Sequence, residues 1–143
     1  MTILTLATDA NRAEEEAVSG VLAAHNAGAG WPMDPLPLRI VLRDAAGVIQ
    51  GGLLGGINWR WLWVRNLAVA PALRGQRLGS RLLAAAEAEA VRRACVGVRL
   101  DTYSFQARGF YLKHGYTETG RIEGCPPGQT RYTMIKRLGA GEG

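Results

Sequence analysis

A loop rich in arginine and glycine lies near the middle of this 143-residue sequence. An apolar run ends at Pro71, and Arg74, Gly75, Arg77 and Gly79 then lead into an alanine-rich segment. The first N–H groups of a helix lack partners and carry its positive dipole end, so they can bind an anion. Glycine lets the backbone approach that anion, and arginine adds charge-assisted hydrogen bonds to phosphate oxygens. The segment predicts a phosphate-binding loop, the alternative being a tight strand-to-helix connection with solvated arginines.

The elements that must position this loop follow from hydrophobic periodicity and turn residues. We expect a strand at 3–7, a helix that begins with Asn11 and Glu14 at capping-box spacing, and a hairpin around 45–47. Further along the chain we expect a strand at 61–69, a helix at 78–94, a strand at 96–101, a short helix at 104–114 capped by Ser104, and a hairpin of 116–122 and 130–137. The order β-α-β-β-β-α-β-α-β-β predicts an α/β (α+β) fold in which helices flank a mixed sheet.

Aromatic residues and glycines in the strands each allow more than one interpretation. Trp59, Trp61 and Trp63 alternate, which predicts that they share one face of a strand. They fit either a substrate pocket or, as the simpler interpretation, packing beneath a helix. The glycines at 51–52 and 55–56 predict bulges or close backbone approach. Cys95, before a strand, is expected to be buried.

Composition limits the class of protein. A hydrophobic content of 48% and a charged content of 20% predict one globular domain at 1–138, with 139–143 as a flexible tail. No apolar run reaches the roughly 20 residues of a membrane helix, and the first residues do not resemble a signal peptide. The two cysteines form neither a metal-ligand motif nor a disulfide framework. We therefore expect a cytoplasmic protein without a metal. The net charge of +5 suits a polyanionic partner, either a phosphorylated cofactor or nucleic acid.

A second motif, SFQARGFYLKHGY, occupies residues 104–116. With both motifs in this order, the chain resembles the GNAT superfamily of acyl-CoA-dependent N-acyltransferases. The phosphate loop of that family, Arg/Gln-x-x-Gly-x-Gly/Ala, is similar to residues 74–79, which follow Leu67-Ala68-Val69. The later family motif, Asn-x-x-Ala-x-x-Phe-Tyr-x-Lys-x-Gly-Phe/Tyr, is matched at Ser104, Ala107, Phe110, Tyr111, Lys113, Gly115 and Tyr116. The resemblance covers nearly the whole chain and implies a GNAT-type bent sheet.

The resemblance also implies a reaction, in which an amine attacks the thioester of acetyl-CoA directly. Tyr111 would protonate the departing thiolate, and the main-chain N–H near Val69 would stabilise the oxyanion. The alternative for Tyr111 is a core aromatic residue with a satisfied hydroxyl. The acceptor would be a small-molecule or peptide amine, and homodimers are common among relatives. The residues implied to bind the cofactor are Leu67, Ala68, Val69, Arg74, Gly75, Gln76, Arg77, Leu78, Gly79, Ser80, Ser104 and Phe110.

The sequence departs from the family pattern in three places. Arg77 stands where the family usually has a glycine, and we expect a helical backbone there with the side chain folded over a phosphate. Ser104 replaces the usual asparagine, which otherwise contacts the cofactor arm. Arg65 and Asn66 stand where many relatives have a glutamate that relays the proton of the amine.

Some group must still take a proton from the substrate ammonium before it can attack. Candidates for this role or for the acceptor side of the site are His25, Trp31, Asp34, Asp101, His114 and Glu123. Without the usual glutamate, a catalytically silent acyl-CoA-binding module is an alternative, against which Tyr111 argues. A basic nucleic-acid-binding domain is a third interpretation, but the sequence lacks a helix-turn-helix, zinc or aromatic stacking signature.

Overall fold

The chain divides into two compact units, Met1–Asp34 and Pro35–Gly143, of which the computed structural model describes residues 1–139. The expected tail at 139–143 lies, apart from Gly139, outside the described residues. The two units are described separately.

The smaller unit contains one helix, α1 (Arg12–Gly28). The Oδ1 atom of Asn11 accepts the Glu14 N–H at 3.1 Å, and the Asn11 N–H donates to Glu15 Oε2 at 3.1 Å. The predicted capping box is confirmed, with Glu15 making the reciprocal bond. The expected strand at 3–7 is wrong, because these residues form no strand. An extended segment becomes a strand only when a neighbour takes up its N–H and C=O groups, and the six-stranded sheet does not include 3–7.

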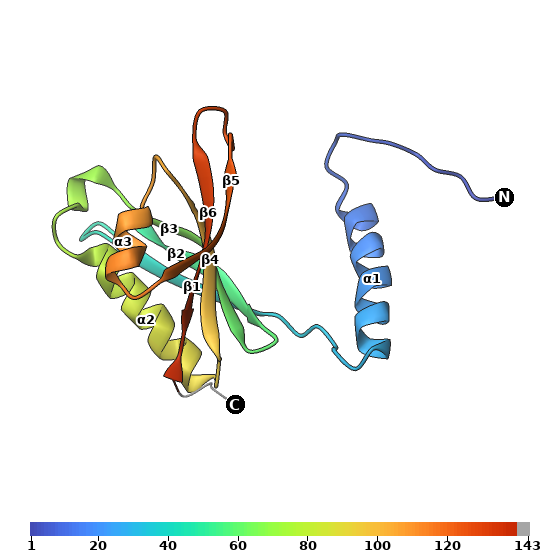
Figure 1. Ribbon diagram of the computed structural model, residues 1–143, viewed down its shortest axis with the longest axis horizontal. Coiled ribbons are helices and arrows are strands. Elements are labelled where there is room, and N and C mark those ends of the chain that lie inside the picture. The colour runs from blue at the N-terminus through green and yellow to red at the C-terminus, as the bar shows by residue number, and fades with distance from the viewer. Residues whose placement is uncertain (140–143) are drawn as a thin grey trace. The chain divides into compact units, whose positions relative to one another are not determined.

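The larger unit is a six-stranded mixed sheet in the order β1-β2-β3-β4-β6-β5, with two helices on one face (Figure 1). Neighbouring strands are antiparallel except β3 and β4, which are parallel. Apart from the missing first strand, the predicted order of elements is confirmed. The elements are β1 (Leu36–Arg43), β2 (Ile49–Asn58), β3 (Trp61–Val69), the 3-10 turn η1 (Pro71–Leu73), α2 (Leu78–Arg92), β4 (Gly97–Tyr103), α3 (Arg108–Lys113), β5 (Thr117–Glu123) and β6 (Thr130–Arg137).

The core lies between the sheet and α2. The helix buries Leu82, Leu83, Ala86 and Ala90. Their spacing places them on one face of a helix with 3.6 residues per turn. Ala85 of the same helix is exposed. The strands supply Leu53, Leu62, Val64, Val98, Leu100 and Met134 to the same core. Cys95 is fully buried there, as predicted.

Two glycines in β2 allow the neighbouring strand to approach. A β-carbon on Gly55 would collide with the Trp63 carbonyl oxygen, and one on Gly51 would collide with that of Ala68. The register between β2 and β3 shifts next to Gly55, which marks a bulge. The predicted bulge and close backbone approach are therefore confirmed.

The tryptophans do not share one strand face. Trp59 and Arg60 form the two-residue turn between β2 and β3, with φ values of 50° and 63°, as a primed hairpin turn requires. Trp61 and Trp63 lie on the face of β3 opposite the buried Leu62 and Val64. Arginines pack over both rings: Arg99 lies 5.1 Å from the Trp63 centroid and Arg137 lies 5.5 Å from that of Trp61. Because α2 covers the opposite face of the sheet, this pair does not pack beneath α2.

Helices α2 and α3 end with the same backbone motif. In α3 the residue after the C-cap is Gly115, with φ 87°, and in α2 it is Ala94, with φ 60°. In both helices the next N–H, of Tyr116 or Cys95, donates back to the last turn at 3.0 Å and 2.9 Å respectively. These are Schellman motifs, which favour glycine at the left-handed position. The glycine of α3 identified its helix end in the sequence, whereas the alanine of α2 did not.

Candidate active site

Strands β3 and β4 pair over only part of their length. Residues 61–64 pair with 97–100, and beyond Val64 and Leu100 the two strands separate. The opening is a cleft of about 700 Å³. Both sequence motifs line this cleft, the first in the loop after β3 and the second in and before helix α3. The lining residues are Val64, Arg65, Asn66, Leu67, Ala68, Val69, Arg74, Gly79, Asp101, Thr102, Phe105, Gln106, Ala107, Phe110 and Tyr111.

The bulge in β3 lies at the point where the strands separate. Arg65 is the additional residue, because Val64 and Asn66 have partners on β2 and Arg65 has none. Val64 points into the core before the bulge, whereas Leu67 and Val69 pack against the core after it. The inserted residue changes the phase of the strand. Arg65 and Asn66 are consequently exposed beside the cleft, with Arg65 Nε donating to Asn66 Oδ1 at 3.3 Å.

The main chain of Val69 faces the cleft. The next N–H, that of Ala70, donates to the Gln50 carbonyl beside β2 at 2.8 Å. Because N–H directions alternate along a strand, the Val69 N–H points to the other side, which is the cleft. On that side the Nε of Arg74 donates to the Val69 carbonyl at 3.4 Å. The wall of the cleft therefore offers a main-chain donor at Val69.

The loop before α2 presents a series of unused donors. The backbone N–H groups of residues 75–80 have no hydrogen-bond acceptor among the 139 residues that the structure describes. The first later N–H to be bonded is that of Arg81, which donates to the Arg77 carbonyl at 3.1 Å. These donors lie at the positive end of a 15-residue helix. The predicted anion-binding geometry is present in this loop.

The backbone of Arg77 is not helical. It is the N-cap of α2 with φ 57° and ψ 26°, in the left-handed region. The expectation of a helical backbone at Arg77 is therefore wrong. Left-handed geometry at this position explains why a glycine would fit there, since a β-carbon makes that conformation costly. The guanidinium forms no ion pair with any of the described residues, and its side chain is exposed.

Tyr111 is 6% exposed and lines the cleft from α3. Burial raises the pKa of its hydroxyl to about 12, so the group stays protonated at neutral pH. No described residue forms a hydrogen bond to this hydroxyl, yet no buried polar side-chain atom of the described residues lacks a partner, so the hydroxyl must reach open space. Its ring packs edge-on against Tyr116 at 5.6 Å. Tyr116 is anchored in turn by a 2.7 Å hydrogen bond to Glu87 of α2.

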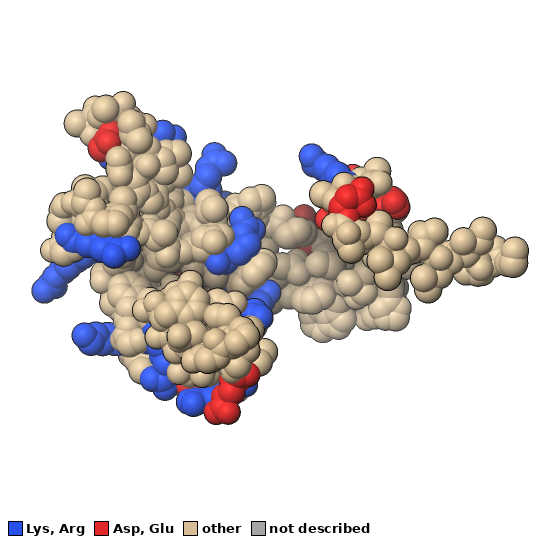
Figure 2. Space-filling model, turned by 90° about the horizontal axis from the view of Figure 1, so that it is seen from above, with Lys and Arg blue, Asp and Glu red and all other residues tan. Residues whose placement is uncertain are grey.

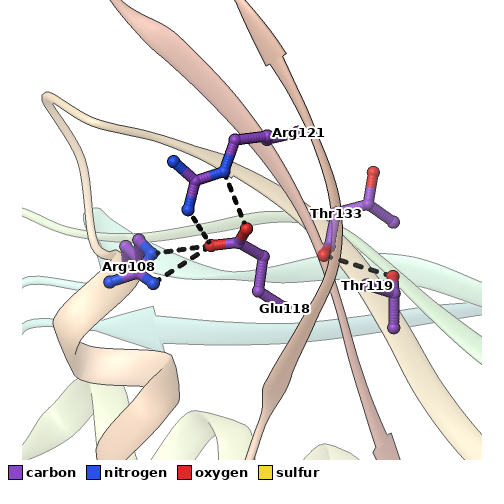
Figure 3. Close-up of polar contacts among 5 residues, drawn as sticks. All are labelled: Arg108, Glu118, Thr119, Arg121 and Thr133. Atoms are coloured by element: carbon purple, nitrogen blue, oxygen red, sulfur yellow. Dashed lines mark hydrogen bonds and ion pairs between the residues drawn. The ribbon is translucent and has the colours of Figure 1, made fainter.

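Ion pairs hold the start of α3 against the sheet. Arg108 donates to Glu118 Oε1 at 3.1 Å and 3.0 Å, and Arg121 reaches the same carboxylate at 2.9 Å and 3.1 Å (Figure 3). The hydrogen bonds from Arg121 and then Arg108 lower the pKa of Glu118. Nearby, the Thr119 hydroxyl donates to the Thr133 carbonyl at 3.3 Å and ties β5 to β6. The start of the helix that carries Tyr111 is thus fixed to β5.

Asp101 is the first residue of β4 beyond the paired stretch. Its Oδ2 accepts from Arg131 Nη2 at 2.6 Å, and its Oδ1 accepts from the Thr133 hydroxyl at 3.0 Å. The hydrogen bond from Arg131 to Asp101 raises the pKa of that guanidinium. A carboxylate has about four acceptor positions, so capacity remains for a donor from the cleft. Asp101 alternates with the buried Leu100 and Thr102, which places it on the sheet face opposite α2.

The other predicted residues are less closely connected to the cleft. Ser104 does not cap α3, which begins at Arg108; its hydroxyl donates to Gln129 Oε1 at 2.6 Å and accepts the Thr130 N–H at 2.9 Å. The predicted cap is therefore wrong. Glu123, at the end of β5, is exposed and does not line the cleft. His25, Trp31 and Asp34 belong to the smaller unit.

Several cleft residues were absent from the sequence-based prediction. Phe105 and Gln106 belong to the loop between β4 and α3, whose residues have no periodicity. Thr102 is the buried polar residue of the core, and its hydroxyl accepts the Ala107 N–H at 3.3 Å. The sequence could have indicated Thr102, because it is a polar residue at a strand position whose alternation with its neighbours points into the core.

On the one face that Figure 2 shows, the basic side chains do not form one continuous surface. The Lys and Arg residues of the larger unit lie there in several separate groups. None of the helices formed by residues 1–139 has the length and apolar character needed to cross a membrane. Within the same residues, no group of three or more His, Cys, Asp or Glu side chains could hold a metal ion.

Comparisons with known proteins point to one family. A family model described as "Acetyltransferase (GNAT) domain" matches residues 39–118. Blasticidin-S acetyltransferase from Streptomyces morookaense is 41% identical over 110 residues, which are 74% of this chain and 81% of that protein. The chain belongs to the GNAT acetyltransferase family. The resemblance found in the two sequence motifs is confirmed.

Other GNAT proteins match more of the chain. An acetyltransferase from Agrobacterium fabrum is 35% identical over 124 residues, 87% of this chain and 90% of its own. A crystal structure of an acetyltransferase from Agrobacterium tumefaciens superposes with a TM-score of 0.89 and 34% identity, covering 96% of this chain and 100% of the other. The protein is accordingly an acetyl-CoA-dependent N-acetyltransferase with the GNAT fold.

Proposed function

We propose that this GNAT enzyme acetylates the primary amine of a small molecule in the opening between β3 and β4. The observation that carries the proposal is the convergence of three groups on one cleft, namely the main-chain N–H of Val69, the hydroxyl of Tyr111 and the carboxylate of Asp101. Each group can serve one step of amide formation. The N–H can donate a hydrogen bond to the oxyanion, the hydroxyl can act as an acid, and the carboxylate can bind the amine.

Acetyl-CoA fits the residues on the α2 side of the cleft. The unused N–H groups of residues 75–80 match the oxygens of a diphosphate, and Arg74 supplies a cation beside them. The edge of β3 at 67–69 has lost its β4 partner, so it can pair with the amide groups of the pantetheine arm as another strand would. The thioester carbonyl would then meet the Val69 N–H.

The reaction requires one bond to form and one to break. The amine nitrogen attacks the carbonyl carbon, and the C–S bond breaks with its electron pair moving to sulfur. The Val69 N–H stabilises the oxygen while it carries charge, which is often the largest single contribution to catalysis. Tyr111 gives its proton to the sulfur, because burial keeps its hydroxyl protonated with a pKa of about 12. The nitrogen loses one proton to water and the tyrosinate takes one back from water, so the products are an amide and a thiol and Tyr111 is restored.

Asp101 is the carboxylate that we propose binds the amine. Among the acidic candidates of the larger unit, Asp101 lines the cleft and Glu123 does not. Its bonds to Arg131 and Thr133 fix its orientation. A carboxylate in this position attracts the ammonium group of the substrate. It can take a proton from that group and pass it to water before the amine attacks the thioester. This assignment gives the enzyme an acidic group on the acceptor side, where Arg65 and Asn66 replace the usual glutamate.

One relative supports the proposed acceptor class. Blasticidin-S acetyltransferase, by its name, acetylates blasticidin S, and it shares 41% identity with this chain. We therefore propose a small cationic amine of that type, and blasticidin S is the first compound to test. The deciding experiment measures release of the coenzyme A thiol with blasticidin S and with a panel of simple diamines.

Two variants test the named roles. Tyr111→Phe should bind acetyl-CoA with unchanged affinity and lower kcat by about 10²–10⁴-fold. Asp101→Asn should lower kcat/KM for the amine without changing acetyl-CoA binding. Glu123→Gln is the matched control, since Glu123 is also a carboxylate of the larger unit but is exposed and lies outside the cleft. Acetyl-CoA binding without turnover of any amine would favour a catalytically silent module, and no binding would overturn the proposal.

A further inference from the structure

His114 connects the helix of the catalytic tyrosine with the loop before α2. Its Nε2 lies 2.9 Å from the Ser80 hydroxyl, and its Nδ1 lies 2.8 Å from the Phe110 carbonyl oxygen. The ring also packs on Phe110, which lines the cleft, with centroids 4.3 Å apart. Gly79 lies beside the same ring, since a β-carbon there would be in ordinary van der Waals contact with Phe110 at 3.6 Å.

The two partners fix the tautomer of the neutral ring. The Phe110 carbonyl can only accept, so Nδ1 must carry the proton. Nε2 is then an acceptor, and the Ser80 hydroxyl must donate to it. The carbonyl of Phe110 belongs to the last turn of α3, where carbonyls lack helical partners, so the imidazole caps its own helix.

Protonation of the His114 ring would reverse the direction of its hydrogen bond with Ser80 and would keep its hydrogen bond to Phe110. An imidazolium donates from both nitrogens, so Phe110 keeps its bond and the Ser80 oxygen becomes an acceptor. The Ser80 hydroxyl proton is then free to turn toward the loop. Ser80 belongs to the first turn of α2, and its own backbone N–H is one of the unused donors of residues 75–80. The charge and the released hydroxyl both favour an anion bound there.

We propose that His114 is a positioning residue that takes up a proton when the diphosphate of coenzyme A binds to residues 75–80. Binding and protonation are thermodynamically linked, so each must strengthen the other by the same factor. The inference goes beyond acetyl transfer itself and uses only the phosphate-binding part of the proposed function. It predicts that the affinity for coenzyme A is highest when His114 is charged and falls as the pH rises.

Other charged groups lie on the elements that meet at His114. They are Arg77, Arg81 and Glu87 on α2, Lys113 on α3, and Lys136 on β6, which pairs with Glu87 at 2.9 Å. Except for Glu87 these are cations, and all are present with and without the ligand. A change in the protonation of His114 on ligand binding therefore reports the added anion and not the background charge.

The test is an NMR titration of the two histidine rings, His25 and His114, with and without 3′-dephospho-coenzyme A. This probe retains the diphosphate and lacks the phosphomonoester, which would itself titrate near pH 6. His25→Asn removes one signal and assigns the other. We expect the midpoint of the His114 titration to rise by about one pH unit on binding, with the ring ¹⁵N signals showing the Nδ1–H tautomer at high pH.

The same linkage predicts how the affinity changes with pH. Below the midpoint of the free protein the probe should bind about tenfold more tightly than above the midpoint of the complex. His114→Gln cannot be charged, so this part of the pH dependence should disappear. Binding with an unmoved or lowered His114 midpoint would overturn the inference alone. Failure of the probe to bind would overturn the phosphate site of the proposed function as well.

Discussion

Replacement of Arg77 by glycine should change stability and cofactor affinity in opposite directions. The residue has φ 57° and ψ 26°, so its β-carbon is held in a conformation that costs about 1–2 kcal/mol. Glycine removes that cost but loses about 0.4–1 kcal/mol more backbone entropy on folding. The difference predicts that Arg77→Gly raises the free energy of unfolding by about 0.7 kcal/mol, which is near 2 °C in Tm.

Affinity should fall because the guanidinium is lost. Arg77 is exposed, so its attraction to a diphosphate is partly screened and is expected to be worth about twofold to fivefold in the Kd for acetyl-CoA. Arg77→Ala removes the same cation but keeps a β-carbon at the left-handed position. The two variants should therefore bind acetyl-CoA equally, while the glycine variant is the more stable by about 0.7 kcal/mol.

Urea unfolding gives the stability, and calorimetry with acetyl-CoA gives the affinity. Ala94→Gly is the matched control, because Ala94 has nearly the same backbone, with φ 60°, at the opposite end of α2. It should gain stability with no change in affinity. An Arg77→Gly variant less stable than Arg77→Ala would refute the left-handed assignment. Equal affinity for Arg77→Ala and the wild type would show that the guanidinium does not reach the cofactor.

Three further changes test the packing around the site. Gly55→Ala should lower the free energy of unfolding by about 3 kcal/mol in urea, because its β-carbon would collide with the Trp63 carbonyl oxygen. Burial raises the pKa of Tyr111 from 10 to about 12, so stability should be full below pH 10 and fall as the pH rises to 12, a loss that Tyr111→Phe reduces. Glu118→Gln should lower Tm at neutral pH, and the deficit should vanish in acid, because the lowered pKa of Glu118 stabilises the fold only while its carboxylate is charged.

The sequence predicted those elements whose signals are local. Turn residues and capping residues marked the two hairpins, the start of α1 and the glycine end of α3. The two family motifs predicted which segments meet, although more than 20 residues separate them, because they belong to a known fold. The cleft residues Val69, Arg74 and Tyr111 were found in this way.

The errors arise where the side-chain pattern does not determine the backbone conformation or its hydrogen-bond partners. The segment at 3–7 has strand periodicity but is not part of the sheet, and an apolar pattern alone cannot supply a neighbouring strand. Trp59 was expected in a strand, but it forms the turn between β2 and β3 together with Arg60. At Arg77 the backbone conformation is imposed by the entry into α2, which no property of an arginine side chain indicates.

Two departures from local rules lie on the path that a cofactor would take. The bulge at Arg65 changes the phase of β3 where it leaves β4, and the left-handed Arg77 begins the helix with its N–H groups unused. Both make the fold less regular, and both expose main-chain groups to the cleft. A regular strand would have bonded its main chain to β4, and no cleft would separate the two strands. The cleft is therefore a property of interrupted backbone pairing, and Tyr111 and Asp101 line it with the side chains to which we assign the chemistry.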